Sequence, residues 1–286
     1  MVESVKTLAA LRRHIASLEG VPASQPHARV ETGHAAIDQA LDGGLARGRV
    51  HEFFAAVEEA AAGAGLALIL ARLAAVDAPL LWLRTVAAGR AGGMPYGPGL
   101  AALGVDPERL VIGVMADDGM LLRAAVDALR CPALGGLVVE LRGSAPLLDL
   151  TASRRLALAA EASGVTAFML RVGGDPAPSA ADTRWRVAAA PSLPVPGNGP
   201  GMCAFDLSLL RRRAGRDGLG WRLVWDNGRG MFEESGGGRD ERHDLGQSGR
   251  EQDGRRQNGG GRDRQAPLSG AVVSVSAGRP AADRAA

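Results

Sequence analysis

The stretch HEFFAAVEEAAAGAGLALILARLAA, residues 51–75, decides the fold of this protein. It begins with an apolar strand at 51–55, passes through a turn rich in small residues, and continues as an apolar helix from residue 65. An α/β nucleotide-binding fold places its phosphate loop between such a strand and helix, and that loop ends in Gly-Lys-Ser/Thr. No such sequence occurs here. The stretch therefore predicts the strand and helix of that fold and leaves open whether ATP binds between them.

Strands and helices alternate between residues 30 and 172. The expected strands are near-continuous apolar runs, as in a parallel sheet covered on both faces. Residues 203–226 have the pattern of an antiparallel strand pair at one edge of the sheet, and Thr151 is the expected N-cap of the last helix in the alternating region. The pattern predicts an α/β fold with a mostly parallel sheet, helices on both faces and antiparallel edge strands. Beyond 51–55, its parallel strands are expected at 79–85, 109–115, 135–143 and 165–172.

Composition divides the chain into three parts. Residues 1–28 hold an amphipathic helix, 3–19, and a polar linker, and the helix either packs on its own domain or docks on a neighbouring subunit or partner. Residues 29–227 form the core. Residues 228–286 are rich in Gly, Arg, Asp, Gln and Ser, which predicts a disordered tail. The apolar patch of that tail, GAVVSVSAG (270–278), is either a strand that adds to a partner's sheet or an inert terminus. The apolar stripe of the helix consists of Val5, Leu8, Leu11, Ile15 and Leu18.

Composition also excludes several classes of site. Cys131 and Cys203 form no CxxC pair and have no nearby histidine, and the five histidines lack ligand spacing, so we expect no disulfide framework, metal or cofactor. Lys6 is the only lysine, so the chain offers none for a phosphate loop. No apolar run reaches the roughly 20 residues of a membrane span, and no signal peptide is recognisable. We therefore expect a cytoplasmic protein without membrane contact, associated with the nucleoid when induced.

Three segments in chain order resemble the RecA recombinase core. The segment ETGHAAIDQALDGGLARGRVHEFFA (31–55) resembles its beginning, where a short helix and a Gly-rich turn lead into the strand before the phosphate loop. The segment LGVDPERLVIGVMADDGMLLRAAVDALR (103–130) resembles the stretch that leads to the helix before Walker B. The segment GGLVVELRG (135–143) lies where the Walker B strand is expected. The resemblance implies a RecA-like fold of the P-loop NTPase type.

A combination of four further segments narrows the resemblance. They are YGPGLAALGVDPERL (96–110), DLTASRRLALAAEASGVTAFMLR (149–171), TRWRVAAAPS (183–192) and DLSLLRRRAGRDGLGWRLVWD (206–226). Together they resemble the ImuA family, RecA-related proteins of bacterial damage-induced mutagenesis cassettes, over roughly residues 5–226.

The resemblance implies an accessory or scaffold protein in SOS-induced translesion DNA synthesis. The implied partners are an ImuB-type inactive homologue of Y-family polymerases and an error-prone C-family DNA polymerase, with RecA and DNA as further candidates. Some members of the family have also been labelled SulA-like cell-division inhibitors, which keeps that function as an alternative.

The residues at the phosphate loop predict a degenerate nucleotide site. Ala62, Gly63 and Ala64 stand about where Gly-Lys-Thr would be, so the lysine and the magnesium-binding hydroxyl are missing. Glu58 and Glu59 fall inside the would-be phosphate cradle, where two carboxylates would repel ATP. We therefore expect no catalytic residues and no ATP hydrolysis, and a divergent RecA-like DNA-dependent ATPase is the alternative.

The two strands that would complete an ATPase site also depart from the pattern. Arg84 and Thr85 follow the second apolar strand, where a RecA enzyme has the glutamate that positions water. Glu140 ends the Walker B strand in place of the usual aspartate. It is either a remnant that could bind magnesium or a strand-end carboxylate that pairs with an arginine such as Arg142.

Arginines near tryptophans form the candidate surface for DNA or a partner. Arginine and aromatic side chains together bind single-stranded nucleic acid, but the alternation in RWRV and WRLVW puts the tryptophans on one strand face, which favours a place in the core. A solvated face and a protein interface remain alternatives for the arginines. The candidates are Arg154, Arg155, Arg171, Arg184, Arg186, Arg211, Arg212, Arg213 and Arg216, and the nearby tryptophans are Trp185, Trp221 and Trp225.

Overall fold

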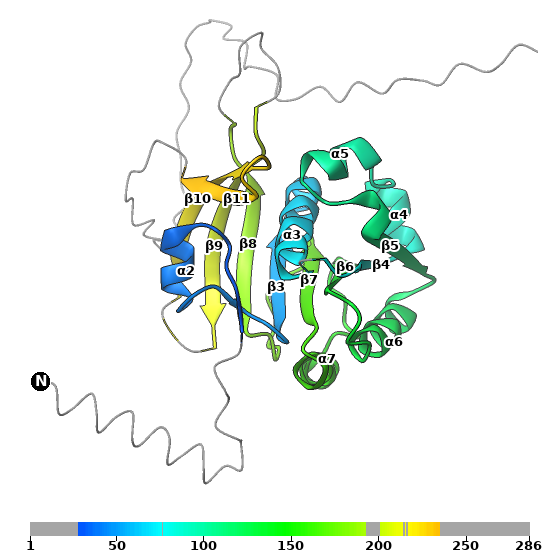
Figure 1. Cartoon of the computed structure of the whole chain (residues 1–286). Coiled ribbons are helices and arrows are strands. Elements are labelled where there is room, and N and C mark those ends of the chain that lie inside the picture. The colour runs from blue at the N-terminus through cyan, green and yellow to red at the C-terminus, as the bar shows by residue number, and fades with distance from the viewer. Residues whose placement is uncertain (1–27, 76, 193–200, 214, 216, 235–286) are drawn as a thin grey trace, which may run out of the picture. The chain divides into compact units, whose positions relative to one another are not determined.

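The structure is a computed structural model that describes residues 28–75, 77–192, 201–213, 215 and 217–234. Its centre is a nine-stranded sheet of order β11-β10-β9-β8-β3-β7-β6-β4-β5, and β1 and β2 form a separate antiparallel pair (Figure 1). The strands are β1 Arg29–Val30, β2 Leu45–Ala46, β3 Val50–Ala55, β4 Leu80–Thr85, β5 Leu110–Met115, β6 Gly136–Arg142, β7 Thr166–Val172, β8 Thr183–Ala189, β9 Ala204–Arg212, β10 Leu219–Asp226 and β11 Met231–Glu234.

The sheet has a parallel part and an antiparallel part. Strands β5, β4, β6, β7, β3 and β8 run parallel, while β8, β9, β10 and β11 pair antiparallel. This arrangement confirms the predicted parallel sheet with antiparallel edge strands. The helices are α2 Ala35–Ala40, α3 Ala60–Ala75, α4 Val86–Gly92, α5 Gly97–Ala102, α6 Asp118–Leu129 and α7 Leu150–Ser163, with a short 3₁₀ helix, η1, at Pro107–Arg109.

Two apolar clusters cover the two faces of the sheet. One joins α3 to side chains such as Phe53, Val138 and Leu170, and the other joins α6 and α7 to neighbours of these residues in the same strands, such as Leu137 and Val139. Successive strand residues point to opposite faces, so burial of both sets explains why the strands are continuous apolar runs rather than alternating ones.

Polar caps fix where the two helices on the second face begin. Asp117 accepts a hydrogen bond from the Met120 amide at 2.7 Å, and Asp149 accepts one from the Ala152 amide at 2.7 Å. The expectation that Thr151 caps α7 is wrong, because the helix begins two residues earlier and Asp149 provides the cap. Gly164 ends α7 in the left-handed conformation, φ 82°, which glycine adopts without strain.

The expected disorder from residue 228 is wrong for residues 228–234. They form a turn and strand β11, which pairs with β10, and Phe232 packs edge-on against Trp225 with 4.9 Å between ring centroids. A four-residue strand with one buried aromatic side chain carries too little pattern to be recognised in a polar segment. The predicted helix 3–19, the apolar patch 270–278 and Arg216 lie outside the described residues. Among the residues that are described, no helix has the length and apolar character needed to cross a membrane.

Candidate functional site

The turn between β3 and α3 is the segment for which the sequence analysis predicted a degenerate phosphate loop. The amide of Glu59 donates to the Ala56 carbonyl at 3.0 Å, and the amide of Ala60 donates to the Val57 carbonyl at 3.4 Å. Helix α3 begins at Ala60, earlier than expected, and the Gly63 amide already donates to Glu59 at 3.0 Å. A phosphate loop directs such amides at its anion. Here they satisfy carbonyls of the turn itself.

The two glutamates of this turn have different surroundings. Glu58 is exposed, whereas a carboxylate oxygen of Glu59 accepts a hydrogen bond from the backbone amide of Ala189, at the end of β8, at 2.7 Å. Glu59 therefore ties the start of α3 to the neighbouring strand. Both residues lie in the turn between β3 and α3, and the prediction that their carboxylates would repel ATP stays a prediction.

Gly63 packs directly on the sheet. A Cβ atom built on it would lie 2.7 Å from Cδ1 of Leu170 and 2.9 Å from Cβ of Ala55, closer than real Cβ atoms approach other atoms. The flanking Ala62 and Ala64 are half-buried. The position matched to the lysine thus has no room for a side chain, and the first turn of α3, residues 60–62, consists of alanines whichever residue is matched to the lysine.

Glu140 is enclosed by two arginines. A guanidinium nitrogen of Arg84 lies 3.1 Å from one of its carboxylate oxygens, and Nε of Arg142 lies 3.0 Å from the other. The side chains of Glu140 and Arg84 are each only 3% exposed. Arg84 also donates to the Gly93 carbonyl at 2.7 Å and lies over the ring of Trp82. Of the two interpretations of Glu140, the structure shows the ion pair with Arg142.

Sequence reasoning missed that Arg84 is the buried partner of Glu140. Strands β4 and β6 are neighbours, with Leu83 opposite Val139, so the next residue of each strand lies side by side at the same edge of the sheet. Opposite charges in two otherwise apolar strands were the available signal, because buried charged side chains are paired. Thr85, one residue on, accepts a hydrogen bond from the Ala88 amide and caps α4.

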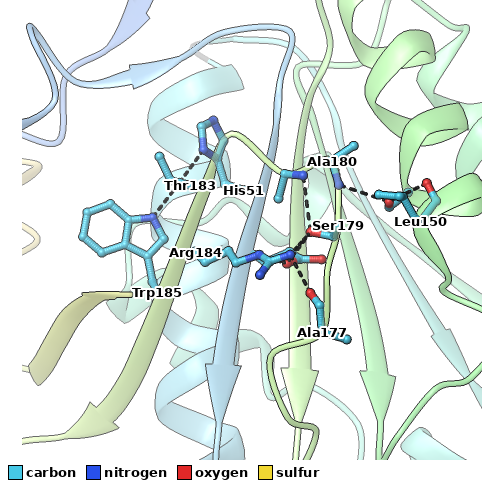
Figure 2. A network of polar contacts seen from close by, with 11 residues as sticks. His51, Leu150, Ala177, Ser179, Ala180, Thr183, Arg184 and Trp185 are labelled. Carbon is cyan, nitrogen blue, oxygen red and sulfur yellow. Dashed lines mark hydrogen bonds and ion pairs between the residues drawn. The ribbon is translucent and has the colours of Figure 1, made fainter. Parts of the chain in front are cut away.

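A second buried network fastens the segment between β7 and β8 (Figure 2). Ser179 donates to a carboxylate oxygen of Glu52 at 2.9 Å, and Nε of Arg184 lies 3.0 Å from the same oxygen. Arg184 also donates to Ser179 at 2.7 Å, and the Ala180 amide donates to Ser153 of α7 at 3.1 Å. Burial raises the pKa of Glu52, and the hydrogen bond from Ser179 and the charge of Arg184 oppose that shift.

His51 links three elements on the opposite face of β3. Its Nε2 lies 3.0 Å from the Ala46 carbonyl and its Nδ1 lies 2.8 Å from the Thr183 hydroxyl, which accepts a hydrogen bond from Nε1 of Trp185 at 2.7 Å (Figure 2). A neutral ring with its proton on Nε2 satisfies all three contacts. Burial lowers the pKa of His51, against the hydrogen bond to Ala46 and the charge of Asp182.

The lowered pKa of His51 predicts acid sensitivity. Because the folded pKa lies below the unfolded value of about 6.5, the unfolded state takes up the proton first. The stabilising contribution is complete above about pH 6.5 and is lost as the pH falls toward the folded pKa, at up to about 1.4 kcal/mol per pH unit. Urea unfolding at a series of pH values between 7.5 and 5.5 should show this loss for the natural chain and a flatter profile for His51→Gln.

The raised pKa of Glu52 has the opposite sign, because its folded pKa lies above the unfolded one and protonation in that interval favours the folded state. Comparison of the natural chain with His51→Gln cancels this contribution, since both contain Glu52. Parallel pH profiles for the two proteins would show that His51 does not titrate on unfolding.

The candidate arginines do not form one surface. Arg171 and Arg184 are buried, which corrects their assignment to a DNA or partner surface. Arg171 donates to the Ser144 carbonyl at 3.2 Å, and burial lowers its pKa. Arg212 is partly buried and pairs with Asp42. The exposed members are Arg154 and Arg155 on α7, Arg186 on β8, Arg211 on β9 and Arg213 directly after β9.

The tryptophans lie in the core, as the alternation indicated. Trp185 and Trp225 are buried, and Trp221 is half-buried with its ring centroid 6.0 Å from that of Trp185. Trp185 in turn stacks on Phe53 at 6.5 Å. These rings are occupied by other side chains of the protein and present no stacked platform for bases.

Comparison with solved structures identifies the fold. A crystal structure of the RadB recombinase superposes with a TM-score of 0.50 at 18% sequence identity, covering 72% of this chain and 99% of that one. The similarity confirms the predicted RecA-like fold. No protein-family model matches the chain.

Comparison with curated protein sequences finds a more specific similarity. Protein ImuA from two strains of Caulobacter vibrioides is 39% identical over 139 residues, which cover 45% of this chain and 55% of each relative. The chain thus spans about half the length of the curated relatives it matches. The similarity confirms the resemblance to the ImuA family.

Proposed function

We propose that this protein is a RecA-like accessory factor of the bacterial DNA-damage response that works by binding other proteins and does not hydrolyse ATP. The observation that carries the proposal is the combination of a complete RecA-like sheet with a phosphate-loop position closed by its own packing. The similarity to Protein ImuA supports the link to damage-induced mutagenesis.

Three features of the described residues support the proposed absence of ATP hydrolysis. The amides of Glu59 and Ala60 are bonded within the turn, and Gly63 leaves no space for a lysine side chain. Glu140 pairs with both Arg84 and Arg142, so a magnesium ion at its carboxylate would have to displace two guanidinium groups. Because Arg84 is buried, its charge would then be left without compensation, which is costly.

The proposed partners are the ImuB-type inactive polymerase homologue and the error-prone C-family polymerase that the ImuA resemblance implies. RecA and DNA are further candidates. The exposed arginines on α7, β8 and β9 are the candidate contacts for an anionic partner, because each keeps its guanidinium group at the surface. With these partners, the protein would act as a scaffold in translesion DNA synthesis.

Nucleotide titration tests the non-catalytic half of the proposal. We expect the full chain to show no saturable binding of a fluorescent ATP analogue with magnesium and no ATP hydrolysis above background with single-stranded DNA present. RecA in the same buffers is the positive control. Saturable magnesium-dependent binding with turnover would instead support the divergent DNA-dependent ATPase.

Co-purification tests the scaffold half. The full chain should retain the ImuB-type subunit, and an arginine-surface variant, Arg154→Glu with Arg155→Glu, can be compared with the matched variant Arg211→Glu with Arg213→Glu to locate the contact. If neither the ImuB-type subunit, the C-family polymerase nor RecA is retained, the scaffold proposal is wrong.

A further inference from the structure

A groove with a volume of about 560 Å³ lies between α6 and α7, which pack on each other over the second face of the sheet. The two helices follow β5 and β6, strands of the parallel part, so they begin at the same edge of the sheet and run in the same direction. The apolar residues that line the groove include Val126, Leu158, Ala159 and Ala162, and its charged residues are Arg130 and Arg155. Of the described residues that line it, none is acidic.

Helix α7 has an apolar stripe on its outer side as well as on its inner side. On the inner side, Leu156 and Ala160 are buried. The groove-lining positions 155, 158, 159 and 162 have the spacing of one continuous helix face. Leu158 in this face is 66% exposed. Because the outer side of a surface helix is normally polar, this face of α7 has the pattern of a surface that another molecule covers.

Arginines stand at the two ends of the apolar part of the groove. Arg155 lies about 10 Å before Ala162 along the axis of α7, whereas Arg130 directly follows the last residue of α6, level with the end of α7. Arg130 pairs with Asp127, but both side chains are largely exposed, and such a pair is easily exchanged. Arg155 is exposed and forms no ion pair or side-chain hydrogen bond with the described residues. The groove therefore offers positive charge on both sides of an apolar centre.

The exposure and charge of the groove select one kind of occupant. Sites for small molecules enclose about 70–90% of the ligand, whereas this groove is open, with the Arg130 side chain 70% exposed. Single-stranded nucleic acid stacks on aromatic rings, and the described lining contains none. Two copies of the chain that met groove to groove would bring arginines against arginines, and like charges repel. A segment of a different protein, with apolar and acidic side chains, matches both features.

We propose that the groove between α6 and α7 binds a segment of a partner protein in which carboxylates flank one or two apolar side chains. The apolar side chains cover Leu158 and pack against Val126 and Ala162, and the carboxylates pair with Arg155 at one end and Arg130 at the other. The inference rests on the part of the proposed function in which this protein binds other proteins. It does not depend on which proteins these are.

Selection from a peptide library tests the proposal on the full chain. The immobilised protein is exposed to phage that display random dodecapeptides, and phage that also bind the Leu158→Glu variant are removed. We expect the enriched peptides to combine Asp or Glu with Leu, Ile, Val or Met. One of these peptides, synthesised with a fluorescent label, should bind the natural chain at least about tenfold more tightly than it binds Leu158→Glu or Arg155→Glu.

Leu147→Glu and Arg186→Glu are the matched controls, because each changes an exposed residue of the same type outside the groove lining. Neither should alter the affinity for the peptide, and circular dichroism checks that every variant is folded. A peptide with its acidic residues replaced by lysine should lose affinity for the natural chain and regain part of it with Arg155→Glu.

The proposal is wrong if the natural chain enriches no peptide over Leu158→Glu, or if the enriched peptides lack acidic residues. An oligothymidylate whose binding is lost in Arg155→Glu and kept in Leu158→Glu would assign the groove to nucleic acid instead. A dimer that Leu158→Glu dissociates would assign it to a second copy. A chain that retains the ImuB-type subunit but selects no acidic peptide overturns only the groove, and the reverse result contradicts only the proposed partners.

Discussion

Glu140→Gln should lower the free energy of unfolding by about 3–5 kcal/mol, because it removes one partner of a buried ion pair. Arg84 is 2% exposed and its guanidinium lies 3.1 Å from the carboxylate. The neutral amide leaves that charge in the interior without a counter-charge at position 140, although the carbonyls of Ala88 and Gly93 and the ring of Trp82 still contact it. Urea unfolding at pH 7.5, followed by circular dichroism, measures the change.

The matched control is an ion pair of the same type at the surface. Arg130 and Asp127 are 3.2 Å apart with side chains 70% and 73% exposed, so Asp127→Asn should change the free energy of unfolding by less than about 1 kcal/mol. A combined Arg84→Met and Glu140→Leu variant removes both charges and should recover most of the loss. If Glu140→Gln costs no more than Asp127→Asn, the pair does not stabilise the fold as described.

This result bears on how ATP hydrolysis is tested. Loss of activity in a Glu140 variant would not distinguish a lost magnesium ligand from a destabilised fold. Nucleotide titration of the natural chain avoids that ambiguity, which is why the proposed function rests on it.

Trp185→Ala should lower the free energy of unfolding by about 3–5 kcal/mol, the cost typical of deleting a buried aromatic side chain. Trp185 is 1% exposed, stacks on Phe53 with an interplanar angle of 6°, and donates its indole hydrogen to Thr183. The substitution leaves a cavity at the centre of the sheet. It also removes the hydrogen bond that Trp185 donates to the Thr183 hydroxyl, which in turn contacts His51. Thermal and urea unfolding measure the loss.

Trp221→Ala is the matched control. Trp221 belongs to the same aromatic group but is only half-buried, so its removal should cost clearly less than that of Trp185. The pair also tests the nucleic-acid hypothesis for these rings. A Trp185→Ala protein that keeps its stability but loses affinity for single-stranded DNA would contradict the place of Trp185 in the core.

Much of the fold could be predicted because it depends on apolar runs, and these are visible in the sequence. The β3–α3 stretch and the later strands carry enough apolar residues to mark a sheet buried on both faces. The antiparallel pair of β9 and β10 was recognisable from its alternation. Strand β11 was not, since four residues with one buried phenylalanine hardly differ from the segment that follows.

The candidate site was predicted in part, because pairing across a sheet does not show in one sequence. The absence of a lysine after Lys6 was visible, but the packing of Gly63 against Leu170 depends on which strand lies below the helix. Alternation correctly separated Trp185 from its arginine neighbours. It did not show that Arg184 is also buried, because in a sheet covered on both sides neither face implies exposure.

The closed turn after β3 also bears on whether the folded protein needs a bound nucleotide. A phosphate loop without its anion has amide groups with no hydrogen-bond acceptor, so a bound nucleotide stabilises its folded structure. Here residues 56–59 supply acceptors from their own backbone, and Glu59 fixes them to β8. On the proposed function, the scaffold is ready for its partners as soon as it has folded, whatever the supply of ATP in a damaged cell.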